Sequence, residues 1–247
     1  MAFDKNTVPK FNIVLGTSGD ITISNSSDIF YLHKNDKQLM ALDTKSNREI
    51  KELYSSYDLA YGDVLISGLG FGILALWIAS KPEVKSVKVI EYSQGVIDLF
   101  LQSNTLPENV TIELSNISTY KSDDKYDCIL LDHFPDLLPE SDWDLNLTSI
   151  KDISRNIPNH NLIWGWSIEH MFLSKKFAIT FEQLFSNPID LRKFDLYSKW
   201  LEFIDKDINV ITLPSLSKHK LTEYIYTYFN YIAVKELNDY ISSLDSV

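Results

Sequence analysis

The stretch DVLISGLGFGILALWIASKPEVKSVKVIEYS (Asp63–Ser93) decides how the rest of the chain is interpreted. It holds three glycines at alternate positions, from Gly68 to Gly72, and a second apolar run that ends at Glu91. The apolar run Val64–Ala79 has 16 residues, which is fewer than the ~20 that a bilayer-spanning helix needs. We therefore interpret it as a buried strand that turns into a helix at the glycines.

Strands and helices alternate from this stretch onward. Strands are expected at 63–68, 86–92, 109–114, 126–133 and 161–167, and helices at 72–81, 93–104 and 142–156. Such alternation implies a parallel sheet built from right-handed βαβ units. The predicted fold class is therefore α/β, with a Rossmann-like sheet.

The first 45 residues have a different pattern. Short β-rich segments at 11–15, 20–24, 28–33 and 38–43 are separated by turn residues and predict a small β-meander. A helix is expected over 46–60, with Ser46 as its N-cap and Glu49 completing a capping box. We therefore divide the chain into a β-meander (1–45) and a Rossmann-like domain (46–247).

The alternation stops again after the fifth strand of the domain. Residues 169–207 carry aromatic side chains at helical spacing and predict a helical insertion, which would act as a lid if it covers the carboxyl edge of the sheet. Two further strands are expected at 208–213 and 226–237.

Composition limits the classes of partner. The formal net charge is −11 and the lysines are scattered, so the sequence predicts neither nucleic-acid binding nor a membrane span. With one cysteine and no apolar leader at the start, we expect a soluble, cytoplasmic chain. Histidine spacing predicts no metal site. Edge strands of the meander favour a homodimer.

The glycine turn predicts a ligand site, because it allows close backbone approach and is followed by unpaired helix amides. The dinucleotide pattern G-x-G-x-x-G fails at Ile73, whereas the spacing G-x-G-x-G resembles that of class I S-adenosylmethionine-binding folds. An acid ending the next strand would accept hydrogen bonds from ribose hydroxyls, and a polar residue after the third strand would meet the adenine edge. The predicted cofactor-binding residues are Gly68, Gly70, Gly72, Glu91, Tyr92, Asn116 and Asp132.

Residues from about 28 to 139 resemble the spermidine synthase-like branch of the class I methyltransferase superfamily. QLMALDTKSN is similar to its L-D-G-x-x-Q strand end, and YDCILLDHFPD to its Y-D-x-I-x-x-D-x-x-D-P motif. Three departures are present: Phe71 replaces an acid of the glycine turn, Thr44 replaces a glycine, and Asp132 and Asp136 lie one residue too far apart. The family's acid pair handles the attacking amine of a polyamine.

These features leave three interpretations open. The first is a methyltransferase that uses S-adenosylmethionine and acts on a small molecule, possibly a cationic one, since the loop after Asp132 is acidic. The second is a polyamine aminopropyltransferase that uses decarboxylated S-adenosylmethionine, and the third is a non-catalytic nucleoside-binding member. Asp132, His133 and Asp136 are the candidate catalytic residues, with Asp132 or His133 as base or orienting group.

Overall fold

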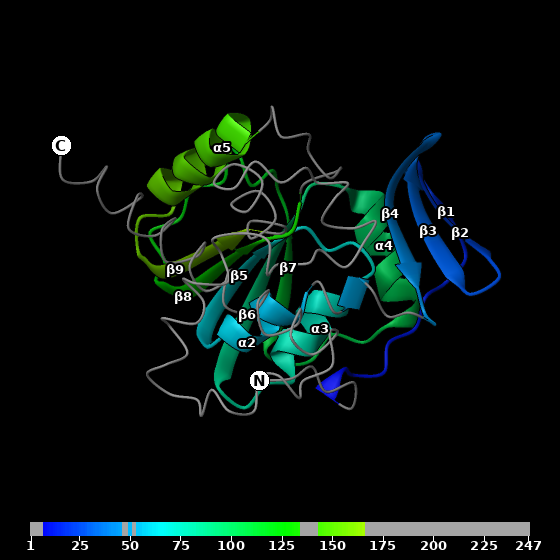
Figure 1. Ribbon diagram of the computed structural model, residues 1–247, viewed down its shortest axis with the longest axis horizontal. Helices are drawn as coiled ribbons and strands as arrows, with labels where there is room; N and C mark the ends of the chain where they lie inside the picture. The colour runs from blue at the N-terminus through cyan, green and yellow to red at the C-terminus, as the bar shows by residue number, and fades with distance from the viewer. Residues whose placement is uncertain (1–6, 46–48, 51–52, 134–142, 166–247) are drawn as a thin grey trace, which may run out of the picture. The chain divides into compact units, whose positions relative to one another are not determined.

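The computed structural model describes residues 7–45, 49–50, 53–133 and 143–165 (Figure 1). Two sheets lie in this part of the chain, and both belong to one compact unit. Among the helices described, none is long and apolar enough to cross a membrane. The predicted helical insertion (169–207), the two last strands and Ser46 fall outside the described residues.

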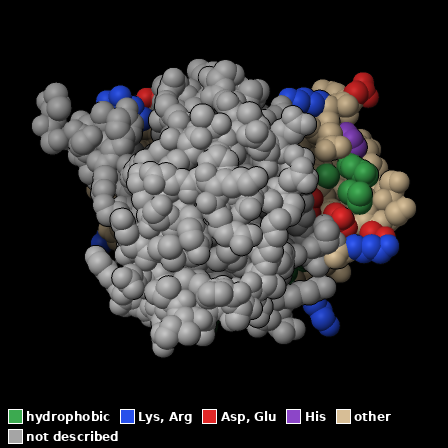
Figure 2. Space-filling view, in the orientation of Figure 1, with side chains coloured by type: hydrophobic (Ala, Val, Ile, Leu, Met, Phe, Trp, Pro, Cys, Tyr) green, Lys and Arg blue, Asp and Glu red, His purple; other side chains and the backbone are tan. Residues whose placement is uncertain are grey.

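The N-terminal sheet is an antiparallel meander, as predicted. Its strands are β1 (Gly16–Ser18), β2 (Ile21–Ser26), β3 (Ile29–Lys34) and β4 (Lys37–Asp43), in the order β1-β2-β3-β4. Two-residue turns join the strands, and Ser27 and Asn35 adopt positive φ in two of them, as tight hairpins require. Figure 2 shows acidic and basic side chains side by side over this sheet.

The first predicted strand is wrong. Residues 11–15 form no strand, and β1 begins at Gly16, inside the segment that was expected to be a turn. The backbone of Asn12 bonds instead to the end of helix α4 (Gln94–Ser103): its N–H donates to Asn104 Oδ1 (3.0 Å) and its carbonyl accepts from Asn104 Nδ2 (2.9 Å). A β-rich local pattern does not reveal that a distant helix end takes these hydrogen bonds.

The second sheet is parallel, which confirms the predicted fold class. Its five strands lie in the order β7-β6-β5-β8-β9. Their bounds are β5 Gly62–Ser67, β6 Val84–Glu91, β7 Val110–Leu114, β8 Tyr126–Leu131 and β9 His160–Gly165. The chain therefore runs outward from β5 to β7 and then returns to the other side of β5. This reversal between β5 and β8 is the topological switch point, where ligands of open α/β sheets bind at the carboxyl edge.

The helices are α2 (Tyr54–Leu59), α3 (Ile73–Ala79), α4 and α5 (Trp143–Asn156). The last three match their predicted bounds within two residues, whereas α2 covers only the end of the helix expected over 46–60. The core centres on α3, where Trp77 is fully buried and its ring stacks on Tyr57 of α2 at 4.5 Å. Ser93 caps α4, because its side chain accepts from the Val96 N–H.

Candidate functional site

The carboxyl ends of β5 and β8 meet directly at the switch point. The backbone N–H of Asp132 donates to the carbonyl of Ser67 (2.9 Å), so the ladder continues one residue past β8. On the other side of β5, the Gly68 N–H donates to the Ile90 carbonyl (2.9 Å). The predicted site residues Gly68, Glu91 and Asp132 therefore lie at the ends of three neighbouring strands.

The three glycines of the turn adopt positive φ angles, which favour glycine. Gly68, Gly70 and Gly72 have φ angles of 93°, 52° and 77°, a region that side chains with a Cβ rarely adopt. A Cβ at Gly68 would collide with the backbone carbonyl of Asp132, and a Cβ at Gly72 would collide with the ring of Phe100. Two of the glycines are thus required by packing alone, whether or not a ligand binds.

Glu91 ties the end of β6 to the glycine turn. Its side chain is buried, with 4% of its surface exposed. One carboxylate oxygen accepts from the Leu69 N–H (2.8 Å) and the other from the Ser93 N–H (2.8 Å). Burial raises the pKa of Glu91, while these backbone amides act in the opposite direction. Sequence reasoning predicted the position of this acid but not its bonds to the turn.

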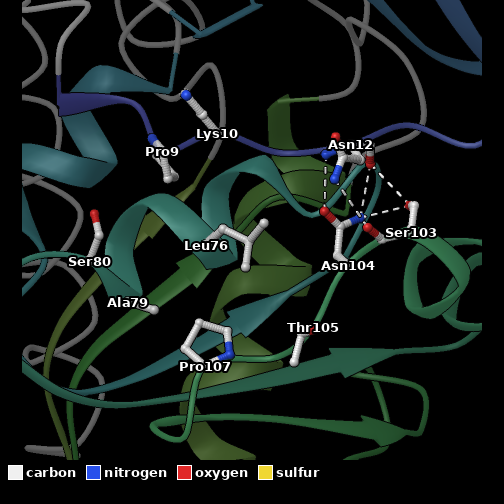
Figure 3. A pocket seen from close by; sticks show the side chains of 10 residues that line it. All are labelled: Pro9, Lys10, Asn12, Leu76, Ala79, Ser80, Ser103, Asn104, Thr105 and Pro107. Atoms are coloured by element: carbon white, nitrogen blue, oxygen red, sulfur yellow. Dashed lines mark hydrogen bonds between the residues drawn. The ribbon is translucent and has the colours of Figure 1, made fainter.

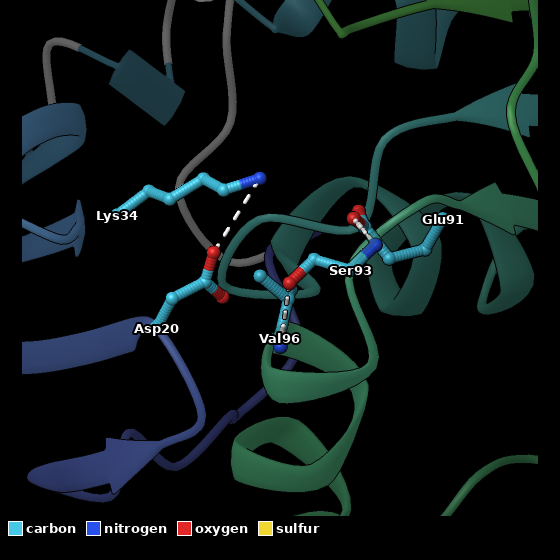
Figure 4. A network of polar contacts seen from close by, with 5 residues as sticks. All are labelled: Asp20, Lys34, Glu91, Ser93 and Val96. Carbon is cyan, nitrogen blue, oxygen red and sulfur yellow. Dashed lines mark hydrogen bonds and ion pairs between the residues drawn. The ribbon is translucent and has the colours of Figure 1, made fainter.

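Tyr92 lies beside the N-terminal sheet. Tyr92 is 54% exposed, and Nζ of Lys34 lies 4.7 Å from its ring centroid. Lys34 also pairs with Asp20 (3.6 Å), and Figure 4 shows this pair near Glu91 and Ser93. Tyr92 is the main cause that raises the pKa of Lys34. The N-terminal sheet thus places a cation next to the predicted cofactor residues Glu91 and Tyr92.

Asn116 follows the end of β7 and is exposed. Its Oδ1 accepts from the Ser118 N–H (3.0 Å), which folds the side chain onto its own loop. The preceding residue, Ser115, donates its N–H to the Glu91 carbonyl (2.9 Å). The loop that carries Asn116 therefore starts next to Glu91.

Two candidate catalytic residues, Asp132 and His133, are partly buried just past β8, and Asp136 lies outside the described residues. Nδ1 of His133 hydrogen-bonds to the hydroxyl of Ser67, the last residue of β5. Burial lowers the pKa of His133 to about 4, so its imidazole is neutral at physiological pH. Sequence reasoning missed Ser67, because nothing in the local pattern distinguishes it from the other small residues of a buried strand.

Met40 is a second residue that the sequence did not indicate. It belongs to β4 of the N-terminal sheet and is partly buried. Its Sδ lies 3.0 Å from the place that a Cβ of Gly70 would occupy. One wall of the glycine turn is therefore supplied by the other sheet.

A cavity lies away from the switch point. About 430 Å³ in volume, it opens between the N-terminal segment and the carboxyl-terminal ends of α3 and α4 (Figure 3). Because helices of βαβ units run back along the sheet, this is the edge where the strands begin. Its polar lining is engaged in holding the N-terminal segment: Asn12 Nδ2 donates to the Ser103 carbonyl (3.3 Å) and Ser103 Oγ to the Asn12 carbonyl (3.1 Å). We therefore place the functional site at the switch point, which depends on strand topology, and not in this cavity.

The described residues offer neither a metal-binding cluster nor a reactive cysteine. Within the described ranges, no cluster of three or more His, Cys, Asp or Glu side chains is placed to hold a metal ion. Cys128 is buried in β8, and burial raises the pKa of its thiol to about 11. Because the thiolate is the reactive form, this cysteine is an inert core residue.

The chain matches no family model and no curated protein. Among solved structures, it is similar to DhpI in complex with SAH, with 15% identity over 49% of this chain and 56% of that chain and a TM-score of 0.36. It is similar to spermidine synthase from Thermotoga maritima, with 16% identity over 60% of this chain and 53% of that chain and a TM-score of 0.39. It is also similar to the N-methyltransferase NodS from Bradyrhizobium japonicum, with 19% identity over 47% of this chain and 65% of that chain and a TM-score of 0.36. The chain thus spans less than two thirds of the length of each of these proteins.

Proposed function

We propose that this chain is a transferase that binds S-adenosylmethionine on the Gly68–Gly72 turn and methylates a small molecule. The observation that carries the proposal is the hydrogen bond from the Leu69 N–H to the Glu91 carboxylate (2.8 Å). This bond sets a strand-end acid against a glycine turn, at the sheet edge where α/β ligands bind.

The donor and acceptor groups present fit a nucleoside. The Glu91 carboxylate has about four lone-pair sites, and although backbone amides such as those of Leu69 and Ser93 take part of this capacity, it can still accept from a ribose hydroxyl. The exposed ring of Tyr92 offers an aromatic face, and Asn116 offers an amide for the adenine edge. In this assignment Glu91 holds the ribose and also keeps the turn in its bound geometry.

When bound, S-adenosylmethionine supplies a sulfonium methyl group for in-line displacement. The chain's contribution is to align the acceptor at the switch point, where Asp132 and His133 lie. A carboxylate at Asp132 would attract a cationic acceptor, which fits the net charge of −11.

Aminopropyl transfer from decarboxylated S-adenosylmethionine is the second candidate. The observation in its favour is the N-terminal antiparallel sheet, whose Met40 lies against Gly70, because Met40 belongs to the QLMALDTKSN segment that resembles the spermidine synthase-like branch. The two candidates differ in whether the site accommodates the carboxylate of the ligand.

Calorimetric titration of the full chain with each of the two ligands, and with NAD as an unrelated control, tests the proposal. We expect S-adenosylmethionine to bind more tightly than its decarboxylated form. Gly70→Ala should weaken this binding at least tenfold, because a Cβ at a φ of 52° and 3.0 Å from Met40 Sδ would distort the turn.

Gly19→Ala is the matched control for that variant. Gly19 has a similar φ of 59°, and a Cβ there would meet nothing within 4 Å. It should leave binding unchanged. Tighter binding of the decarboxylated ligand would favour aminopropyl transfer, and binding of neither would refute the cofactor assignment and leave the glycines as a packing turn.

A further inference from the structure

Lys34 brings a cation from the N-terminal sheet to the end of β6. Its Nζ lies 4.7 Å from the ring centroid of Tyr92 and 3.6 Å from Oδ2 of Asp20. Figure 4 shows the Lys34 side chain extending toward Glu91 and Ser93, which belong to the other sheet and its connection to α4. Burial raises the pKa of Glu91, and the positive charge of Lys34 acts in the opposite direction. The ammonium and the buried carboxylate therefore act on the same part of the candidate site.

The packing of the meander against α4 fixes the position of Lys34. Lys34 pairs with Ile21 in the ladder between β2 and β3, and Ile21 is fully buried. The first turn of α4 approaches so closely that a Cβ at Gly95 would lie 3.0 Å from Cγ1 of Ile21. The Ser18 hydroxyl, at the end of β1, donates to Oδ2 of Asp98 in α4 (3.0 Å). Because α4 directly follows the end of β6, the meander is held against the part of the site that is proposed to bind the nucleoside.

An ammonium group supplies what a carboxylate cannot offer to a ribose. Each ribose hydroxyl donates one hydrogen and accepts through its oxygen lone pairs. The ionised Glu91 carboxylate is an acceptor only, so it binds the hydroxyl hydrogen and leaves the oxygen lone pairs without a donor. Lys34 has three N–H donors, and its described partners, Asp20 and Tyr92, leave capacity for a further acceptor.

We propose that Lys34 is a specificity-determining residue, which donates to the oxygen of a ribose hydroxyl whose hydrogen is accepted by Glu91. A donor from the antiparallel sheet and an acceptor from the parallel sheet then recognise the sugar together. The consequence is discrimination in favour of ribose over deoxyribose. This inference rests on the proposed function, because it assigns a further contact in the same nucleoside site.

The placement of Lys34 over the Tyr92 ring can be measured without any ligand. The full chain is labelled with carbon-13 lysine, and the Lys34 signals are assigned by their loss in Lys34→Met. The ring current of Tyr92 should move the ε-methylene protons of Lys34 upfield of those of an exposed lysine, and Tyr92→Leu should abolish this shift. An ordinary chemical shift for Lys34 in the wild type overturns the inference.

The contact with the sugar is tested by calorimetric titration with S-adenosylhomocysteine and with its 2′-deoxy and 3′-deoxy forms. Lys34→Met keeps the aliphatic stem and removes the donors. It should weaken binding of S-adenosylhomocysteine about three- to tenfold, as expected for a hydrogen bond from a partly exposed charged group. Its discrimination against one of the two deoxy forms should shrink by about the same factor. The matched substitution Lys85→Met, on an exposed side chain, should leave affinity and discrimination unchanged.

The outcomes separate this inference from the proposed function. If Lys34→Met binds S-adenosylhomocysteine and discriminates against both deoxy forms as strongly as the wild type does, Lys34 does not contact the sugar and the inference alone is overturned. If the wild type binds none of the three ligands, the cofactor assignment is refuted and the inference with it.

Discussion

The sulfur of Met40 lies 3.0 Å from the position that a Cβ at Gly70 would occupy. These residues belong to different sheets, β4 of the meander and the turn after β5 of the parallel sheet. This proximity makes the meander a part of the candidate site. Substitutions at Met40 and Gly70 should therefore affect stability jointly.

We predict that Met40 and Gly70 are energetically coupled. Gly70→Ala should destabilise the protein by about 1–2 kcal/mol for its positive φ, with an added penalty from the Met40 contact. In a Met40→Ala background this added penalty disappears, so a double-mutant cycle by urea unfolding should give a coupling of at least about 0.5 kcal/mol. Gly19→Ala serves as control and should be additive with Met40→Ala. Additivity of Gly70→Ala would show that the two residues do not touch.

Glu91→Gln should destabilise the chain even when no ligand is present. A glutamine keeps the size of the side chain but replaces one acceptor oxygen with an NH₂ group, which would face the Leu69 or Ser93 N–H. Because the site is buried, the loss should be about 1–3 kcal/mol in the free energy of unfolding. Glu83→Gln, at an exposed position, should change this free energy by less than about 0.5 kcal/mol. Equal effects of the two substitutions would contradict a bracing role for Glu91.

His133 should make the folded state less stable in acid. Its pKa is about 4 in the folded chain, against 6.5 for an ordinary histidine, so between these values the unfolded chain binds the extra proton. The free energy of unfolding should therefore fall as the pH drops from about 6.5 to 4, by up to about 3 kcal/mol from this group.

The measurement for His133 is a set of urea unfolding curves at several pH values. Glu91 also titrates with a shifted pKa, so the relevant quantity is the difference between wild type and His133→Gln. As the pH falls from about 6.5 to 4, the free energy of unfolding should decrease by more in the wild type than in His133→Gln. Parallel pH profiles would mean that His133 is solvated like a free imidazole.

Lys81 should stabilise the end of α2. Its Nζ donates to the backbone carbonyls of Tyr57 (2.9 Å), Asp58 (2.8 Å) and Ala60 (2.8 Å). Lys81→Met keeps the aliphatic stem and removes these donors, so we expect a loss of about 1–3 kcal/mol in urea unfolding. The matched substitution Lys85→Met, on an exposed side chain, should have an effect within about 0.5 kcal/mol. If both lysines behave alike, the three carbonyls are satisfied equally well by water.

Several elements of the fold follow from local pattern. The strand that precedes Gly68 and the strand that ends at Glu91 are continuous apolar runs bounded by turn residues, and both were predicted within two residues of their observed ends. Burial on both faces of a parallel sheet produces such runs, so the α/β class could be inferred from the sequence. The segment 11–15 has a β-rich pattern too, yet its backbone bonds to the end of α4, and no local feature indicates that partner.

The candidate site, like the fold, could be predicted from the sequence only in part. The sequence by itself determined the glycine turn, the acid at the end of the next strand, and the position of Asp132 and His133 at the carboxyl edge beside the fourth strand, because each depends on a residue's place near a strand end. Only the tertiary structure decided that Glu91 accepts from Leu69, that Ser67 bonds to His133, and that Met40 lies against Gly70. These partners are separated by 22 residues, 66 residues and one sheet boundary. Their contacts depend on strand order and register, which are set by the packing of the whole core and not by any short stretch of sequence.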